Sequence, residues 1–204
     1  MQRLASWEAA GALLAKGAIV LLPTDTVPGL HCRVDRPDAV ARLMELKQRS
    51  GRKPFLLLCS GLETALELVS CIDPRALQVA KHCWPGPFTL ILPAREGLPA
   101  CAVSENRSVA IRVPQPSELR QLPAAAGAPL VSTSVNTAGN PPLTDLVAAL
   151  QQFGEMVDGV LEEAPCWLPV SEQVRASALV DLTCWPARVL REGPLPLPAR
   201  FAKR

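Results

Sequence analysis

The sequence has no tyrosine, and aromatic side chains of any kind are scarce. Its aromatic residues are four tryptophans and four phenylalanines among 204 residues. Proteins that bind single-stranded nucleic acid interleave aromatic and basic residues, because bases stack on aromatic rings. The formal net charge is +2, from 21 basic and 19 acidic residues, whereas dedicated nucleic-acid binders are far more basic. The composition therefore argues against a protein whose main role is to hold RNA or DNA.

Patterns typical of metal sites and disulfide frameworks are also missing. The two histidines, His31 and His82, are too few and too far apart for a histidine-based metal site. The seven cysteines are an odd number, are scattered and contain no CxxC pair. This spacing suggests neither a zinc site nor paired cysteines. We expect reduced cysteines in the core or at its boundary, and no protein-held metal.

Long apolar runs are absent as well. No stretch approaches the roughly 18 uninterrupted apolar residues of a membrane-spanning helix, and the N-terminus lacks the basic-then-apolar layout of a signal peptide. Hydrophobic residues nevertheless make up 49% of the chain and charged residues 20%, which is enough for a sizeable core. We therefore expect a folded cytoplasmic protein with no membrane contact, one domain over residues 1–193 and a frayed tail over 194–204.

The common nucleotide-binding and catalytic motifs are missing too. The chain contains neither a GxxxxGK phosphate loop nor a GxGxxG segment after a strand. It also lacks the HExxH zinc motif and the GxSxG nucleophile turn. A nucleotide that binds here would need a site built without a standard loop.

What the sequence does contain is an alternation of helical and extended patterns. We expect helices over residues 7–16, 37–47, 61–68, 74–83, 117–126 and 145–153. Short apolar runs predict strands over 18–22, 55–59, 88–92, 109–113, 129–132, 178–182 and 188–191. The expected helix caps are Ser6, Ser60 with Glu63, and Thr144. The alternation predicts an α/β domain with a mixed sheet covered by helices.

Four cations follow the second predicted helix within seven residues, and they are Lys47, Arg49, Arg52 and Lys53. Cations at a helix C-terminus interact favourably with the helix dipole and are often simply solvated. They could equally form a clamp for a phosphate chain, to which arginine offers a planar fork and lysine a point charge. The cluster alone leaves both interpretations open.

Hydroxyl-rich segments follow two of the predicted strands. Ser132, Ser134 and Asn136 alternate in an extended stretch, so their side chains could line one wall of a site. There they could hydrogen-bond phosphate or carboxylate oxygens. The Thr-Asp-Thr segment at 24–26 follows the first buried strand, at the end where open α/β sheets bind ligands. Each segment could also be an ordinary polar turn.

Arg112 lies inside the apolar run 109–113. A charge in a buried strand needs an anionic partner or must emerge into a cleft, because burying it alone is costly. Arg112 is therefore a candidate receptor for a carboxylate. The alternative is an edge strand whose guanidinium faces solvent.

Six segments, taken in order, resemble the signature segments of one known family. They are PTDTVPGL at 23–30, LKQR at 46–49 with KP at 53–54, WPGPFTL at 84–90, SVAIRVP at 108–114, STSVN at 132–136, and residues 177–181 with LREG at 190–193. The resemblance runs from about residue 8 to residue 193. In these segments the chain is similar to the YrdC/TsaC-like threonylcarbamoyl-AMP synthases.

This resemblance implies a fold and a reaction. The fold would be a single YrdC-like α/β domain, with a twisted mixed parallel and antiparallel sheet flanked by helices and a concave ligand cleft. The reaction would convert L-threonine, bicarbonate or CO2 and ATP into threonylcarbamoyl-AMP and pyrophosphate, which makes the enzyme a nucleotidyltransferase. The product is the precursor for the N6-threonylcarbamoyl modification of adenosine 37 in tRNA. Mg2+ would accompany ATP, held largely by phosphates and water.

The resemblance also assigns residues to the substrates. Threonine would be held by Thr24, Arg112, Ser132 and Ser177. ATP would be held by Lys47, Arg49, Ser108, Ser134, Asn136 and Arg191, with Lys47 and Arg49 catalytic. A downstream tRNA threonylcarbamoyltransferase complex would take over the product, and the protein could itself contact tRNA.

The sequence departs from the family pattern at several positions. Pro28 replaces the usual aromatic residue, Val135 replaces alanine, and Ala176 and Ala178 flank Ser177 in place of proline and threonine. Two other functions stay open. One is a non-catalytic module that binds tRNA or double-stranded RNA, and the other is a related carbamoyl-handling enzyme like the one in hydrogenase maturation. The intact KxR and SxN positions favour the synthase.

Overall fold

The computed structural model describes residues 1–48, 53–137, 139–161, 165, 166, 168 and 174–201. Its strands are β1 (Gln2–Leu4), β2 (Val20–Leu22), β3 (Gly29–Arg33), β4 (Leu56–Leu58), β5 (Phe88–Pro93), β6 (Ser108–Arg112), β7 (Leu130–Ser134), β8 (Gly159–Leu161), β9 (Ala178–Asp181) and β10 (Arg188–Arg191). Its α-helices are α1 (Trp7–Ala15), α2 (Pro37–Leu46), α3 (Leu62–Leu66), α4 (Pro74–Cys83), α5 (Ser117–Ala126) and α6 (Leu146–Phe153), and η1 (Ala100–Ala102) and η2 (Gly154–Met156) are 3-10 turns. No helix in these described ranges is long and apolar enough to cross a membrane.

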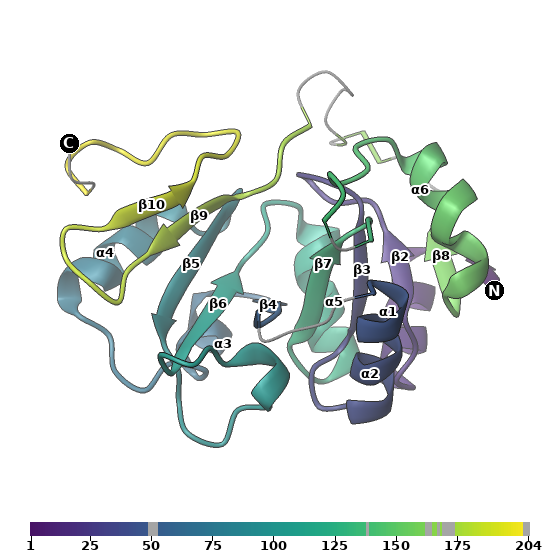
Figure 1. Cartoon of the computed structure of the whole chain (residues 1–204), viewed down its shortest axis with the longest axis horizontal. Coiled ribbons are helices and arrows are strands. Elements are labelled where there is room, and N and C mark those ends of the chain that lie inside the picture. The colour runs from purple at the N-terminus through teal and green to yellow at the C-terminus, as the bar shows by residue number, and fades with distance from the viewer. Residues whose placement is uncertain (49–52, 138, 162–164, 167, 169–173, 202–204) are drawn as a thin grey trace.

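The strands form one twisted sheet with the order β1-β8-β2-β3-β7-β4-β6-β5-β9-β10 (Figure 1). Both β1 and β2 run parallel to β8, β4 runs parallel to β6, and β5 runs parallel to β9. The remaining pairs are antiparallel. The predicted mixed sheet flanked by helices is therefore confirmed.

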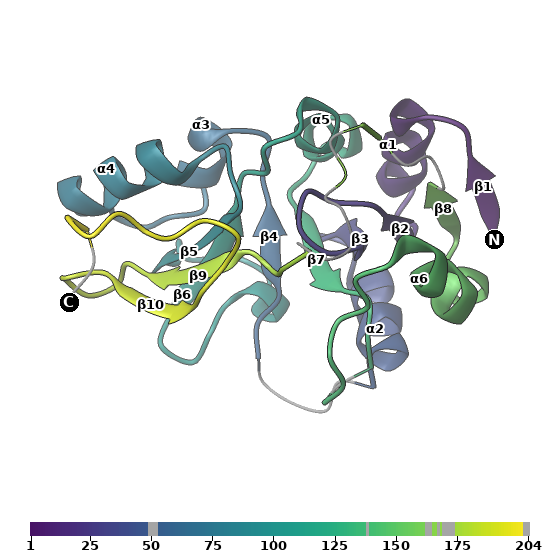
Figure 2. The same ribbon diagram turned by 90° about the horizontal axis from the view of Figure 1, so that it is seen from above.

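The helices cover the two faces of the sheet unequally. On one face, α2, α3, α4 and α6 contribute to a large apolar core that runs across most of the sheet. On the other face, α1 and α5 form a second, smaller core with the half of the sheet that contains β8, β2, β3 and β7 (Figure 2). The candidate site lies on this same second face, beside α5, over parts of β3, β7, β4, β6, β5 and β9.

The sequences of β2 and β4 are continuous apolar runs because each strand packs against an apolar core on both faces of the sheet. In β2, Leu21 packs into the larger core while Val20 and Leu22 pack beneath α1 and α5. In β4, Leu57 and Leu58 divide between the two cores in the same way. A strand buried on both faces needs no polar side, so its sequence lacks alternation.

Three strands occur where the sequence pattern predicts none. The strand β3 begins at Gly29, inside the segment 23–30 for which the sequence pattern predicts no strand. The apolar residues Leu30 and Cys32 lie on one face of the sheet, and Gly29, His31 and Arg33 lie on the other. Because these three residues interrupt the apolar run, the sequence of β3 does not look like a buried strand. The strands β1 and β8 have three residues each. Such short strands form through pairing with their neighbours and leave little periodic signal of their own.

One expected helix cap is confirmed and another is wrong. The Ser6 hydroxyl accepts a 3.3 Å hydrogen bond from the Ala9 amide at the start of α1, as predicted. At α6, Asp145 is the cap in place of Thr144. The Asp145 carboxylate accepts from two backbone amides of the first turn, at 3.3 and 3.0 Å. Its two oxygens satisfy two amides at once, which a single hydroxyl could do less well.

The predicted cap formed by Ser60 and Glu63 is also wrong. The residue before α3 is Gly61, whose amide donates a 3.1 Å hydrogen bond to the Thr64 hydroxyl. The helix therefore starts one residue later than the sequence pattern suggests. The Thr64 side chain in the first turn accepts the hydrogen bond that a glutamate would accept in a capping box, so Glu63 is not needed for the cap.

The C-terminal segment is packed rather than frayed over its described part. Leu197 and Phe201 are each only 8% exposed and belong to the larger core. The Ala187 amide donates a 3.2 Å hydrogen bond to the Phe201 carbonyl, and the Phe201 ring lies 5.6 Å from the imidazole of His82 on α4. The expectation of a loose tail is wrong because these apolar side chains are buried in the larger core, with Phe201 beside α4 and Ala187.

Candidate active site

A cavity of about 540 Å3 lies on the same face of the sheet as α1 and α5, where these helices leave the strands uncovered. Its floor is made of strand residues, namely Gly29, Ser132, Ser134, Leu56, Leu58, Ala110, Arg112, Thr89, Ile91 and Leu179. Side chains directly opposite one another in paired strands point to the same face. The register places Leu56 opposite both Ser132 and Ala110, and Thr89 opposite Arg112. Strand register therefore gathers these residues into one cavity.

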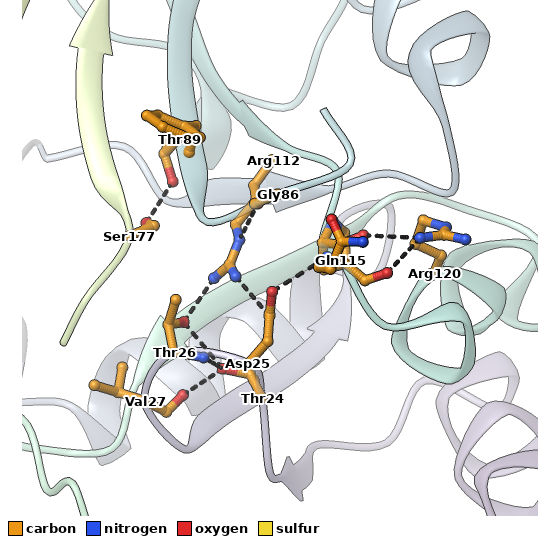
Figure 3. Close-up of polar contacts among 12 residues, drawn as sticks. Thr24, Asp25, Thr26, Val27, Gly86, Thr89, Arg112, Gln115, Arg120 and Ser177 are labelled. Carbon is orange, nitrogen blue, oxygen red and sulfur yellow. Dashed lines mark hydrogen bonds and ion pairs between the residues drawn. The ribbon is translucent and has the colours of Figure 1, made fainter. Parts of the chain in front are cut away.

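The Arg112 guanidinium joins three parts of the chain at one end of this cavity. It donates to the Asp25 carboxylate at 2.6 Å, to the Thr26 hydroxyl at 2.7 Å and, more weakly, to the Gly86 carbonyl at 3.4 Å (Figure 3). Arg112 is only 5% exposed. The alternative of an outward-facing edge arginine is therefore wrong, and the buried charge has an anionic partner as the sequence requires. Burial lowers the Arg112 pKa, and the Asp25 charge opposes that shift.

The loop after β2 is held by its own hydroxyl groups. The Thr24 hydroxyl donates to the Val27 carbonyl at 2.7 Å and accepts from the Thr26 amide at 3.1 Å. Both threonines are buried, and both line the cavity. The Asp25 carboxylate also accepts from the Gln115 amide at 3.2 Å (Figure 3). These contacts give the Thr-Asp-Thr loop a fixed shape against the end of β6.

A second group of polar contacts lies beside Arg112, on the neighbouring strands β5, β9 and β10. The buried hydroxyls of Thr89 and Ser177 are 2.7 Å apart and share a hydrogen bond (Figure 3). Arg191 on β10 donates to the Ser177 carbonyl at 3.0 Å and to the Ser177 hydroxyl at 3.4 Å. Partial burial of the Arg191 guanidinium, followed by the positive charge of Arg112, lowers the Arg191 pKa. Two cations therefore face the same part of the cavity.

Lys47 supports the end of β7 from the C-terminus of α2. Its side chain is 4% exposed, and its ammonium group donates to the Ser134 carbonyl at 2.6 Å and to the Asn136 amide oxygen. The Ser134 hydroxyl donates to the same amide oxygen at 2.8 Å. The Asn136 nitrogen in turn donates to the Asn140 carbonyl at 2.7 Å. Lys47, Ser134 and Asn136 thus form one connected group.

The structure brings most of the predicted site residues together. Those that line the cavity are Thr24, Ser108, Arg112, Ser132, Ser134, Ser177 and Arg191. Lys47 and Asn136 are not among the lining residues, but both are hydrogen-bonded to the lining residue Ser134. Arg49 lies outside the described residues, as does Arg52 of the cation cluster, whereas Lys53 lines the cavity.

Several lining residues are missed by the sequence reasoning. Thr89 and Ser104 belong to the cavity wall, and the Ser104 hydroxyl lies 2.7 Å from that of Ser108. Thr89 occurs in the segment WPGPFTL, which carries the family resemblance but no charged residue. A threonine in an apolar strand is ordinary in a sheet, so only its position opposite Arg112 reveals its place in the site.

One buried histidine beside the cavity and three buried cysteines of the larger core are kept uncharged. Burial, with a smaller effect of the Arg112 charge, lowers the pKa of His31 to about 3, and neither ring nitrogen has a hydrogen-bond partner among the described residues. Burial raises the pKa of the Cys32, Cys59 and Cys83 thiols to about 12. Nucleophilic cysteines need the thiolate, so these three are poor candidates for catalysis.

Charge and ligand chemistry define what this cavity can hold. Its described lining residues include arginines, a lysine and hydroxyls but no aspartate or glutamate. No group of three or more metal-ligating side chains occurs in the described part of the chain. Such a wall suits carboxylate and phosphate groups, and any divalent cation here would be held by an anionic ligand and water.

Comparisons with known proteins place this geometry in context. The Sua5/YciO/YrdC family model, described as "Telomere recombination", matches residues 12–193. A threonylcarbamoyl-AMP synthase of Coxiella burnetii is 36% identical over 149 residues, which cover 73% of this chain and 80% of that protein. One of Xanthomonas campestris is 36% identical over 157 residues, which cover 76% of this chain and 84% of that protein.

Solved structures share the fold. The crystal structure of Pyrococcus abyssi Sua5 complexed with L-threonine has a TM-score of 0.83 and 28% identity, covering 96% of this chain but 57% of that longer chain. Escherichia coli YciO has a TM-score of 0.80, with 24% identity over 92% of this chain and 88% of that one. A full-length HypF in phosphate- and nucleotide-bound form has a TM-score of 0.76 at 18% identity, covering 93% of this chain and 29% of that one. The last two likenesses concern the fold alone.

Proposed function

Because the chain belongs to the Sua5/YciO/YrdC family, we propose that it is a threonylcarbamoyl-AMP synthase. Bicarbonate would release CO2 and hydroxide, the amine of L-threonine would attack the carbon of CO2, and the amine proton would pass to the hydroxide, giving a carbamate and water. A carbamate oxygen would then attack the α-phosphorus of ATP. The bond from that phosphorus to the bridging oxygen of the β-phosphate would break, and pyrophosphate would leave. The enzyme would thus be a nucleotidyltransferase.

The observation that carries this proposal is the chemistry of the cavity wall. Among its described residues the wall offers two arginines and a row of hydroxyls, but no carboxylate, thiol or imidazole to act as nucleophile or general base. The proposed reaction needs no nucleophile from the protein, because the substrate amine and the carbamate oxygen are the nucleophiles, and the hydroxide left by bicarbonate takes up the amine proton. A protein contributes to such a reaction by positioning the reactants and neutralising charge that develops on phosphate.

We assign the end of the cavity around Arg112 to threonine. The guanidinium of Arg112 would bind the threonine carboxylate, since a planar fork matches a carboxylate better than a point charge does. The hydroxyls of Thr24, Ser132 and Ser177 would surround the rest of the amino acid. The presence of L-threonine in the Pyrococcus abyssi Sua5 structure, which has the same fold, supports this assignment.

We assign the part of the cavity that borders the threonine to ATP. The nucleotide would contact Ser108, Ser134 and Arg191, which line the cavity. Lys47 and Asn136, which are hydrogen-bonded to Ser134, would also bind the nucleotide. Lys47 and Arg49 would be the catalytic residues, neutralising the triphosphate as pyrophosphate leaves. Mg2+ would enter with ATP and shield the phosphates, because the described wall offers it no carboxylate.

The product would be used outside this protein. Threonylcarbamoyl-AMP is a mixed anhydride of a carbamic acid and a phosphate, so it is suited to transfer its carbamoyl group to an amine. We propose that a tRNA threonylcarbamoyltransferase complex in the cytoplasm accepts it, for modification of adenosine 37. Contact between this chain and tRNA would be limited to that hand-over, since the net charge is only +2.

Other functions receive less support. The relatives that carry the synthase name are 30% identical or more, whereas the HypF structures are below 20% identical and share the fold alone. A module that only binds RNA would have no need of a closed end with two arginines and buried hydroxyls. The synthase explains those features without further assumptions.

The proposal is tested by incubating the purified protein with ATP, L-threonine and bicarbonate. We expect mass spectrometry to detect threonylcarbamoyl-AMP, with pyrophosphate released in equal amount. Serine in place of threonine is the control for amino-acid selectivity, and omission of bicarbonate is the control for carbamate formation. Absence of the adenylate with all three substrates present would contradict the proposal.

A further inference from the structure

Among the hydroxyl groups of the cavity wall, that of Ser104 has no role in the proposed binding of threonine or ATP. Ser104 lines the cavity and lies just before β6, in a short hairpin that leads back to Ser108. The Ser104 amide donates to the Ser108 carbonyl at 2.9 Å, and the Arg107 amide donates to the Ser104 carbonyl at 2.9 Å. Arg107 has a φ of 53°, the left-handed conformation that commonly ends a three-residue hairpin loop. The hairpin therefore holds Ser104 beside Ser108.

The hydroxyl groups of Ser104 and Ser108 form a pair. Their oxygens lie 2.7 Å apart, and the Ser104 oxygen also accepts a 3.1 Å hydrogen bond from the Ser108 amide. Each hydroxyl carries one proton, and one of these two protons makes the shared hydrogen bond. The other proton is available to a ligand, and both residues line the cavity. The pair can therefore donate one hydrogen bond into the cavity.

The pair lies at the opposite end of the cavity floor from Arg112. Ser108 and Arg112 begin and end β6 and both line the cavity, so their backbones are about 13 Å apart. The strand register places Leu58 opposite both Arg112 and Leu130. Ser134 lies further along β7, as far from Leu130 as Ser108 lies from Arg112. The pair and Ser134 therefore share one end of the cavity.

Cations surround this end, which we call the serine end and define by Ser104, Ser108, Ser134 and Lys53. Lys53 lines the cavity, and the ammonium group of Lys47 donates to the Ser134 carbonyl at 2.6 Å. The described lining residues include no aspartate or glutamate. Phosphate oxygens are negatively charged acceptors, so lysines together with a hydroxyl donor suit a phosphate group.

The proposed reaction needs pyrophosphate to leave on the side away from the amino acid. In a displacement at phosphorus, the attacking and leaving oxygens lie roughly in line on opposite sides of the phosphorus atom. With the threonine carboxylate on Arg112, the carbamate oxygen would reach the α-phosphorus from the Arg112 end. The departing pyrophosphate would then point toward the serine end.

We propose that Ser104 is a positioning residue that aims the Ser108 hydroxyl at the pyrophosphate part of ATP. This inference rests on the proposed function, in which Ser108 binds ATP. Phosphate oxygens only accept hydrogen bonds, so the Ser108 proton turns to the ligand and the Ser104 proton turns to the Ser108 oxygen. A chain then runs from the Ser108 amide through Ser104 to the Ser108 hydroxyl and on to phosphate, and each hydrogen bond strengthens the next. The donor faces the charge that develops as pyrophosphate leaves.

The test measures nucleotide and pyrophosphate binding by calorimetry, with Mg2+ present and without threonine or bicarbonate. We expect Ser104→Ala to bind inorganic pyrophosphate and ATP about fivefold more weakly than the wild type does, which is the effect of one hydrogen bond. AMP lacks the pyrophosphate part, so its affinity should not change. An equal loss of affinity for AMP, or an unchanged affinity for pyrophosphate, would overturn the proposal.

A second background separates positioning from a structural effect on the hairpin. Because Ser104 acts through Ser108, adding Ser104→Ala to Ser108→Ala should cause no further loss of pyrophosphate affinity. The same loss in both backgrounds would overturn the proposal.

Two matched variants serve as controls. Ser104→Thr keeps the hydroxyl group, and Asn106→Ala changes an exposed residue of the same hairpin that is not among the lining residues. We expect both to bind pyrophosphate as the wild type does. A loss in either variant as large as that in Ser104→Ala would overturn the proposal.

If Ser104→Ala does not fold, the wild type still tests the proposal. Pyrophosphate and L-threonine would occupy opposite ends of the cavity, so each should bind in the presence of the other. Competition between them would overturn the proposal.

The two proposals fail separately, because pyrophosphate binding is measured without turnover. A wild-type protein that forms no adenylate from threonine, bicarbonate and ATP would contradict the proposed function. A wild-type protein that forms the adenylate, together with a Ser104→Ala variant that binds pyrophosphate as the wild type does, would contradict the role of Ser104 alone.

Discussion

The Lys47 ammonium group donates a 2.6 Å hydrogen bond to the carbonyl of Ser134, although 87 residues separate the two along the chain. The contact ties the C-terminal end of α2 to the end of β7, where Ser134 lines the cavity. A lysine that sequence motifs assign to a phosphate chain is thus also part of the framework of the site. Its replacement should therefore affect both activity and stability.

We expect Lys47→Ala to reduce the release of pyrophosphate at least about 100-fold, because a charge-assisted contact to phosphate is lost. Loss of the lysine also removes a donor from the Ser134 carbonyl, which should cost about 1–3 kcal/mol of stability. The melting temperature should then fall by roughly 2–4 °C for each kcal/mol lost. Lys16→Ala, at the exposed end of α1, is the matched control. Wild-type pyrophosphate release from Lys47→Ala would exclude a catalytic role.

Ser134→Ala should weaken ATP binding while the protein remains folded. Ser134 lines the cavity, and its hydroxyl donates to the Asn136 amide oxygen at 2.8 Å. Loss of this hydroxyl removes its own contact with ATP and weakens the hold on Asn136, which also binds ATP in the proposal. A single neutral hydrogen bond corresponds to about a fivefold change in the ATP dissociation constant, measured by calorimetry. Ser117→Ala, on the exposed start of α5, is the control. A change in RNA binding alone would favour the RNA-module alternative.

Arg112→Lys should raise the KM for threonine more than the KM for ATP. Lysine keeps the positive charge but has no planar fork, so it cannot bind both oxygens of a carboxylate while holding Asp25 and Thr26. Steady-state kinetics with each substrate varied in turn gives the comparison. A change in the apparent ATP affinity alone would assign Arg112 to the nucleotide.

Valine should be a much poorer substrate than threonine. It has a methyl group in place of the hydroxyl, and it would leave the buried hydroxyls of the cavity without a partner. The ratio of kcat/KM for the two amino acids, measured by adenylate formation, tests this expectation. Equal use of valine would show that Thr24 and Ser132 do not select the substrate.

His31 should make the stability of the protein depend on pH. Its pKa is lowered from 6.5 to about 3 in the folded state, so between these values the unfolded chain binds a proton that the folded chain does not. The stabilising contribution is complete above pH 6.5 and declines by about 1.4 kcal/mol for each pH unit below it, until the folded-state pKa is reached.

Urea unfolding of the wild type and of His31→Leu at pH 7.5, 6.5 and 5.5 measures this effect. Carboxylates contribute equally to both proteins, so the difference between the two isolates His31. We expect the wild type to lose more stability than His31→Leu between pH 6.5 and 5.5. Parallel losses would mean that the imidazole is reached by protons in the folded state.

The sequence allowed the mixed α/β fold and most of the cavity to be predicted, because both depend on local signals. Apolar runs mark the buried strands, and hydroxyls such as Ser132 and Ser134 follow directly after them. The strand β3 was hidden because Gly29, His31 and Arg33 carry no apolar signal. Its formation depends on pairing with β2 and β7, which no short segment encodes.

The partners of the charged residues could not be predicted in the same way. Sequence showed that Arg112 needs an anion, but Asp25 lies 87 residues away and belongs to a loop with several plausible roles. Likewise, nothing local indicates that Lys47 contacts Ser134 and Asn136. Such pairs are decided by how β6 and β7 align with their neighbours, and a shift of one residue in register would turn these side chains to the opposite face.

The cavity wall draws on residues from Thr24 to Arg191, and this spread bears on synthesis as well as on catalysis. A chain emerging from the ribosome contains the Thr-Asp-Thr loop, β4 and β6 long before β10 has been synthesised. Its partly built sheet would expose the apolar floor of the cavity, and the pairing between β5 and β9 would have to wait for some 90 further residues. Long-range pairing of this kind is slow and leaves strand edges open to association. The nascent chain is therefore most vulnerable to aggregation during the interval before residue 191 is released.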